Sequence, residues 1–141
     1  MSPDTDPFEY MMKFIAPALA LSLLAGSAVA APAAPVPGTW LVHGKWGVLA
    51  FKVTCRFSEL GGRIGGECLD GETSHAAIKG GKRHPIKFAA VKDDRLSWSY
   101  RTRWTFYEFD ARYTGMVVNG RTMNGQILAM GKTGTFTAVR Q

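Results

Sequence analysis

The feature that most constrains this fold is a glycine pair, Gly61-Gly62, set between two stretches of alternating apolar residues. Glycine accepts the positive φ angles of two-residue turns, so the pair predicts a β-hairpin. A turn here places Cys55 opposite Cys68 in a non-hydrogen-bonded pair, the type in which facing side chains come closest. It also places Arg56 opposite Glu67. The register therefore predicts a disulfide between the cysteines and an ion pair between the charged residues.

The two faces of this hairpin differ in polarity. Its apolar face carries Phe51, Val53, Cys55, Phe57, Ile64 and Cys68. Such alternation is typical of strands that pack on a core on one side and meet water on the other. Since a slip of one residue would turn this whole face outward, we expect the disulfide to hold the register.

The rest of the chain after Pro37 also indicates β-structure. No segment has a convincing helical period, and turn signals recur about every ten residues. We expect about eight strands joined by short connections. One of these strands is Ser74–Lys79, and a basic turn at Gly80–Pro85 follows it. Short connections favour antiparallel pairing of neighbours. The predicted fold is an all-β, up-and-down antiparallel barrel, with a two-sheet β-sandwich as the alternative.

The last third of the chain refines this prediction. The apolar parity changes between Arg101 and Phe106, which indicates a bulge or a loop there. At Asn119-Gly120, a three-residue loop over 118–120 with Gly120 left-handed keeps Val117 and Met123 on one face. The large side chains predicted inside are Trp40, Phe51, Phe57, Phe88, Trp98 and Tyr100.

Residues 1–30 have the pattern of a secretory signal peptide. Lys13 precedes an apolar run that ends in Ala28 and Ala30, an Ala-x-Ala cleavage pattern. Because the first eleven residues are acidic, we expect translation to start at Met11 or Met12, or the signal to be unusually long. A Pro/Ala spacer (31–37) and one barrel domain (38–141) would follow. Export to the periplasm or medium fits one disulfide in an oxidising compartment, and no transmembrane span remains after the signal.

Short motifs resemble one known family. Gly38-Thr-Trp40 is similar to the Gly-x-Trp signature of lipocalins and the wider calycin superfamily. Tyr113-x-Gly115, followed by Gly125, resembles the final strands of small exported bacterial lipocalin-like proteins of uncharacterised function. The resemblance implies a barrel with a ligand-accommodating mouth and with Trp40 as the plug of its closed end. It also brings in bacterial metalloprotease inhibitors, which use a small barrel with one disulfide.

Candidate catalytic and metal-binding groups are few. His43, His75 and His84 fall in separate strands or turns, without the short spacing of paired zinc ligands. Neither a Gly-x-Ser-x-Gly motif nor a free cysteine offers a nucleophile. Glu108 and Asp110 share an outward face, where cross-strand ion pairs are the simpler role. We therefore expect no enzyme activity, no metal and no cofactor.

The remaining signal is a group of aromatic and basic residues. The full chain has a formal charge of +6, which favours anionic partners. Candidate ligand-binding residues are Trp98, Tyr100, Arg101, Arg103 and Trp104.

The first hypothesis is a binding module for a small apolar or anionic amphiphilic ligand at the open barrel end. The alternative is a periplasmic interaction protein, such as a protease inhibitor or envelope-associated factor, with a filled barrel and an envelope lipid or protein as partner. Export argues against nucleic acid as a partner.

Overall fold

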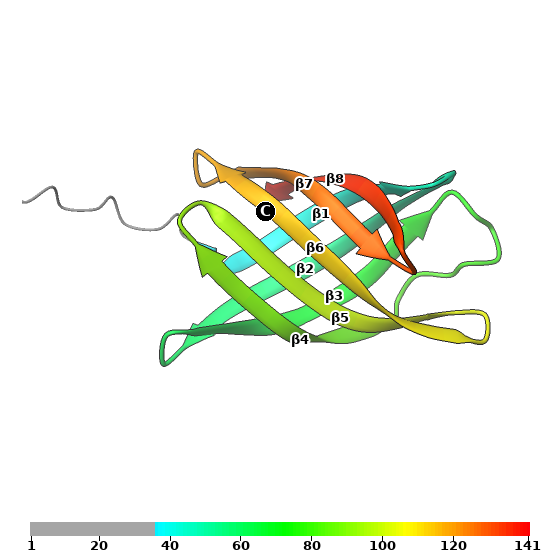
Figure 1. The fold of residues 1–141 in the computed structure, drawn as a ribbon, viewed down its shortest axis with the longest axis horizontal. Coiled ribbons are helices and arrows are strands. Elements are labelled where there is room, and N and C mark those ends of the chain that lie inside the picture. Colours follow the sequence, from blue (N-terminus) through cyan, green and yellow to red (C-terminus); the bar gives the residue numbers. More distant parts are fainter. Residues whose placement is uncertain (1–35) are drawn as a thin grey trace, which may run out of the picture. The chain divides into compact units, whose positions relative to one another are not determined.

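Residues 36–141 form a closed barrel of eight antiparallel strands in this computed structural model, which describes that part of the chain (Figure 1). Each strand pairs with the next in sequence, and β8 closes the barrel against β1. The predicted all-β, up-and-down barrel is thus confirmed. The strands are β1 (Gly38–Trp46), β2 (Leu49–Leu60), β3 (Arg63–Thr73), β4 (Arg83–Lys92), β5 (Arg95–Trp104), β6 (Tyr107–Val118), β7 (Thr122–Ala129) and β8 (Lys132–Arg140).

The expected signal peptide and most of the Pro/Ala spacer lie outside the described residues. Within 36–141, no helix has the length and apolarity needed to span a membrane.

The hairpin of β2 and β3 has the predicted register. Cys55 faces Cys68 and the two form a disulfide, with their Cα atoms 4.1 Å apart. Arg56 faces Glu67, but the predicted ion pair between them is wrong. Glu67 instead binds Arg83 on β4, with 2.6 Å between Nη1 and Oε1. Arg83 lies two residues from the direct partner of Glu67 across the ladder, a diagonal position that a long side chain reaches easily.

Aromatic rings fill the middle of the barrel. Trp98 is 1% exposed and stacks on Tyr113, with ring centroids 4.6 Å apart. Phe57 and Phe136 meet the Trp98 ring edge to face. These contacts make a solid core half-way along the barrel axis, since offset-stacked and edge-to-face rings pack densely and attract one another.

The predicted strand at Ser74–Lys79 is wrong. β3 continues to Thr73, and residues 74–82 form a loop. Hydroxyl groups hold the start of this loop, because Ala50 N donates to Ser74 Oγ and Thr73 Oγ1 donates to the carbonyl of His75. Such side-chain bonds to the backbone compete with a strand ladder. The predicted basic turn also ends early, since Arg83 begins β4.

Phe88 was predicted inside the barrel, and this is also wrong. The ladder between β4 and β5 shifts register between Ile86 and Phe88, and Phe88 is 57% exposed. An extra residue in one strand reverses which face the following side chains occupy. Ala89 and Val91 consequently pack on the core in its place.

The two predicted irregularities near the C-terminus are turns. The parity change falls at the β5–β6 turn, residues 105–106, because Trp104 pairs with Tyr107. The three-residue loop after β6 is confirmed in length but lies one residue later, at 119–121, since Val118 pairs with Thr122. Gly120 has the expected positive φ, 65°.

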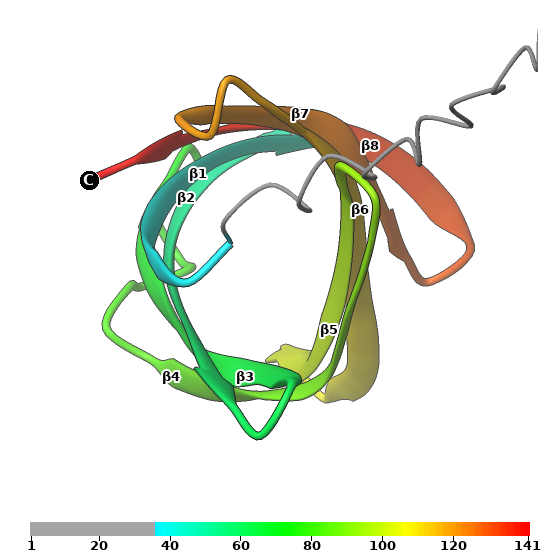
Figure 2. The ribbon, with the colours of Figure 1, turned by 90° about the vertical axis from the view of Figure 1, so that its left-hand side faces the viewer.

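The strand connections gather at two ends. One end, here called the Trp40 end, holds the turns at 61–62, 93–94 and 119–121 and the segment that leads into β1. Figure 2 looks into this end, where that segment (cyan) curves inward from β1. Trp40 is fully buried here, and its Nε1 donates to the carbonyl of Val36 at 2.9 Å. The Arg140 guanidinium lies over the ring, 4.6 Å from its centroid.

Candidate functional site: a cavity at the second barrel end

The second end, here called the cavity end, contains a hollow of about 440 Å³. Its connections are residues 47–48, 74–82, 105–106 and 130–131. The volume falls in the range of small-molecule sites in proteins. The apolar side chains that line it are Trp46, Leu49, Phe51, Val53, Ala77, Ile78, Trp104, Phe109, Ala111, Ile127 and Ala129.

Two tryptophans stand at the mouth of this cavity. Trp46 ends β1 and Trp104 ends β5, and their rings meet edge to face with centroids 5.7 Å apart. The Trp46 Nε1 donates to the carbonyl of Lys132 at 3.1 Å, which fixes its ring. A ligand entering here would therefore meet two large aromatic surfaces.

Cationic side chains surround the aromatic mouth. Lys52, Lys79, Lys82 and Arg103 contribute to the lining. Lys52 pairs with Glu72 at 3.5 Å and Arg103 with Glu108 at 2.9 Å. Lys79 and Lys82, both on the 74–82 loop, make no ion pair with any residue in the described range. The mouth thus has positive charge available for an anion.

A buried histidine joins β3 to β4 beside the cavity. His84 is 4% exposed, and its Nε2 lies 2.7 Å from Asp70 Oδ2, an atom of a residue that lines the cavity. Its Nδ1 lies 3.1 Å from the carbonyl oxygen of Arg101. Because a carbonyl only accepts, Nδ1 carries a proton and donates it. The imidazole also stacks on the Tyr100 ring, with centroids 5.0 Å apart.

Two buried tyrosines form the polar part of the inner wall. The hydroxyl oxygens of Tyr100 on β5 and Tyr113 on β6 lie 2.7 Å apart, and both residues line the cavity. Burial is the largest cause that raises the pKa of both phenols above 10.0, and the negative charge of Asp70 raises the pKa of each further. Both phenols therefore remain protonated and can donate hydrogen bonds at neutral pH.

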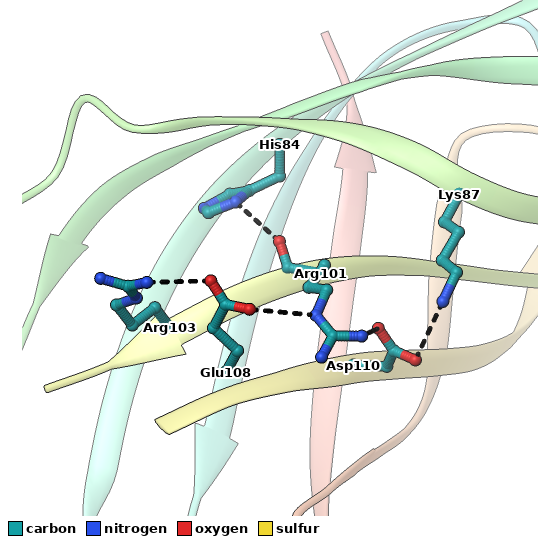
Figure 3. A network of polar contacts seen from close by, with 6 residues as sticks. All are labelled: His84, Lys87, Arg101, Arg103, Glu108 and Asp110. Atoms are coloured by element: carbon teal, nitrogen blue, oxygen red, sulfur yellow. Dashed lines mark hydrogen bonds and ion pairs between the residues drawn. The ribbon is translucent and has the colours of Figure 1, made fainter. Parts of the chain in front are cut away.

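On the outside of the barrel, charged residues link β4, β5 and β6 (Figure 3). Arg101 contacts both Glu108 and Asp110, Arg103 binds Glu108, and Lys87 binds Asp110. The hydrogen bond from Arg103, and then its charge, lowers the pKa of the Glu108 carboxyl. The predicted outward ion pairs of Glu108 and Asp110 are thus present, so these carboxylates do not face the cavity.

The five candidate ligand-binding residues divide into two groups. Tyr100, Arg103 and Trp104 line the cavity. Trp98 lies deeper, in the packed core, and the Arg101 side chain points outward to its carboxylate partners (Figure 3). Trp104 is partly buried and packs on Trp46.

Sequence reasoning missed the polar members of this site, Asp70, His84 and Tyr113. His84 was assigned to a turn, although His84 and Ile86 alternate on one face as β4 begins. Tyr113 could not be linked to Tyr100 from the sequence, since that contact depends on the β5–β6 register. Within residues 36–141, no group of three or more histidine, cysteine or acidic residues has a metal-binding arrangement.

Comparisons with known proteins define the fold only. No protein-family model matches the chain, and no curated protein matches it in sequence. Two solved structures of designed proteins are similar. One is described as the de novo design of a fluorescence-activating β-barrel, with 14% identity over 75% of this chain and 94% of that chain and a TM-score of 0.50. The other is a redesigned β-barrel, mFAP1, bound to DFHBI, with 12% identity over 74% and 94% and a TM-score of 0.52. The closed barrel is consistent with a lipocalin or calycin architecture, and membership of that family stays a prediction.

Proposed function

We propose that this protein is an exported, non-catalytic binding module that holds a small apolar or anionic amphiphilic molecule in the cavity. The observation that carries the proposal is the asymmetry of the barrel. Its interior is packed solid at the Trp40 end, but about 440 Å³ remains at the other end, lined mainly by apolar side chains. Cavities of this size and polarity in β-barrel mouths are typical ligand sites.

The proposed contacts follow from the lining. Trp104 and Tyr100 supply apolar surface, and an anionic group on the ligand would lie at the mouth near Arg103, Lys79 and Lys82. The mFAP1 barrel, by its description, binds the small molecule DFHBI. That precedent supports ligand binding by this kind of barrel without indicating which molecule this chain binds.

Export is part of the proposal. The signal-like residues 1–30 predict it, and the Cys55–Cys68 disulfide is consistent with an oxidising compartment. A non-catalytic role is supported by the arrangement around His84, whose two ring nitrogens are both occupied by Asp70 and the Arg101 carbonyl. No ring nitrogen is left to take a proton from a substrate.

The first test is native mass spectrometry of the protein purified from its own host, combined with titration of a fluorescent fatty-acid probe. We expect either a co-purifying small molecule or saturable probe binding. A clean apo mass together with no probe binding would exclude the carrier function.

A matched pair of variants locates the site. Trp104→Ala removes an aromatic wall of the cavity, so we expect probe affinity to fall about tenfold, in line with burial of a large ring. Phe88→Ala removes an aromatic ring from the outer face, where Phe88 is 57% exposed, and should leave affinity unchanged. Equal effects of the two substitutions would contradict the cavity as the binding site.

A second candidate function, association with an anionic envelope surface, is favoured by the tips of two turns at the cavity end. Val48 and Phe106 are 103% and 93% exposed, and Lys79 and Lys82 lie on the neighbouring 74–82 loop. Exposed apolar tips beside lysines suit a phospholipid surface. Co-sedimentation with anionic vesicles tests it, and Val48→Ser with Phe106→Ser should abolish the binding without affecting the probe.

A further inference from the structure

The two tyrosines in the cavity wall have one hydrogen-bond donor more than they can use. Tyr100 and Tyr113 are 3% and 2% exposed, and their hydroxyl oxygens are 2.7 Å apart. Each phenol carries one O–H donor. Whichever hydroxyl donates to the other, the second O–H has no acceptor among the residues that the structure describes.

A buried O–H group that has no acceptor in the protein favours a bound molecule that can accept its proton, because an unused buried donor costs free energy. The pair is held in this state by its surroundings. Tyr100 is stacked on His84, and Tyr113 is stacked on Trp98, so neither ring is free to swing toward the solvent. Asp70 influences both phenols through its charge, but its Oδ2 is bound to His84 and it makes no hydrogen bond to either hydroxyl.

We propose that the molecule bound in this cavity carries an uncharged carbonyl oxygen that accepts the free phenolic proton of the Tyr100–Tyr113 pair. This inference rests on the proposed function and specifies the chemistry of its ligand.

The acceptor is uncharged because Asp70, a carboxylate, lines the same cavity and would repel an anion at this depth. The available cations, Lys79 and Lys82, belong to the loop at the mouth. A ligand with both groups would therefore bind with its anion at the mouth and its carbonyl at the tyrosines, with the apolar body between them.

The test compares 2-acetylnaphthalene with 2-ethylnaphthalene, which have nearly the same shape and differ in the carbonyl. Binding to the full-length protein is measured by equilibrium dialysis, with the fluorescent fatty-acid probe as reference. We expect the acetyl compound to bind about tenfold more tightly, the gain of one well-formed buried hydrogen bond.

Variants of the tyrosine pair assign the preference to its hydroxyls. Tyr100→Phe and Tyr113→Phe each leave one phenolic donor in the wall, so each should retain part of the preference. The double variant leaves none and should bind both compounds equally. Tyr107→Phe is the matched control, because Tyr107 is 71% exposed and lies outside the cavity lining.

The outcomes separate this inference from the proposed function. If the wild-type protein binds the fatty-acid probe but does not prefer the acetyl compound, the carbonyl site is wrong and the binding module stands. A preference that survives in the double variant would also overturn the carbonyl site. If none of the three compounds binds, the proposed function itself fails. Because the wild-type comparison needs no substitution, the test holds even where the double variant does not fold.

Discussion

At the residue scale, the polar groups of the inner wall depend on one another. His84 donates to the Arg101 carbonyl, binds Asp70 and stacks on Tyr100, while Tyr100 contacts Tyr113. In a low-dielectric interior such chains hold each member in one orientation, since losing a partner leaves a buried polar group without a hydrogen bond. The inner wall of the cavity is therefore held in shape by contacts within the protein itself.

The buried tyrosines make the barrel sensitive to high pH. Burial raises the pKa of Tyr100 and Tyr113 above the value of 10.0 expected in the unfolded chain. The folded state thus holds these protons more tightly, so stability is fully present below pH 10 and falls as the pH rises above it. We expect phenolate absorbance from two tyrosines to appear only together with loss of the barrel's circular dichroism. In the double variant that combines Tyr100→Phe and Tyr113→Phe, unfolding should begin at higher pH than in the wild-type protein. Ionisation of both tyrosines in a barrel that stays folded would contradict this.

At the element scale, the boundaries between neighbouring strands, here called seams, differ in the number of residues that pair across them. β3 and β4 share three paired residues, whereas β5 and β6 share ten. The β3–β4 seam also borders the 74–82 loop and the cavity, and two side-chain contacts cross it, His84 with Asp70 and Arg83 with Glu67. Regions with few backbone hydrogen bonds open first in native proteins. We therefore expect this seam to open more readily than the other seams of the barrel.

The short pairing between β3 and β4 leads to a testable prediction. Amide hydrogen exchange should be faster along the cavity half of β3 and β4 than in β5, β6 and β7. His84→Phe retains the stacking on Tyr100 but leaves Asp70 Oδ2 and the Arg101 carbonyl without their partner. It should speed exchange at the seam and lower the free energy of unfolding by about 1–3 kcal/mol. Uniform exchange across all eight strands would show that the seam is not a weak point.

The β2–β3 hairpin shows where prediction from sequence succeeded. Turn chemistry and period-two alternation located the β2–β3 hairpin with its disulfide, because both signals are local and the Gly61-Gly62 turn sets the register. They failed where a side chain or an extra residue altered the ladder. Hydroxyl bonds ended β3 at Thr73, and a bulge turned Phe88 outward. Neither the end of β3 nor the bulge in β4 can be recognised from the order of apolar and polar residues in the sequence.

The candidate site was only half predictable for a similar reason. Tyr100, Arg103 and Trp104 belong to one strand, β5, and its aromatic-basic alternation was visible in the sequence. Asp70, His84 and Tyr113 come from three other strands. They meet Tyr100 only because the barrel closes with this register and bulge, which are set by packing of the whole domain rather than by local composition.

At the scale of the whole molecule, the disulfide and the closure of the barrel both hold the strands to their neighbours. Every strand of the described barrel has two neighbours, so none presents an unpaired edge. The disulfide joins adjacent positions of one hairpin, 13 residues apart. It therefore constrains a short loop of the unfolded chain and holds register in β2 and β3, while the other ladders close without it.

Removal of the disulfide should accordingly weaken the barrel without abolishing it. For Cys55→Ala with Cys68→Ala, the chain-entropy model gives a loss of about 3 kcal/mol in the free energy of unfolding. Urea titration followed by tryptophan fluorescence measures it, and reduction of the wild-type protein should give a similar loss. Probe affinity should persist in the folded variant, because neither cysteine lines the cavity. A variant that stays folded but loses probe binding would mean that the register of β2 and β3, which the disulfide holds, also shapes the cavity wall at Phe51 and Val53.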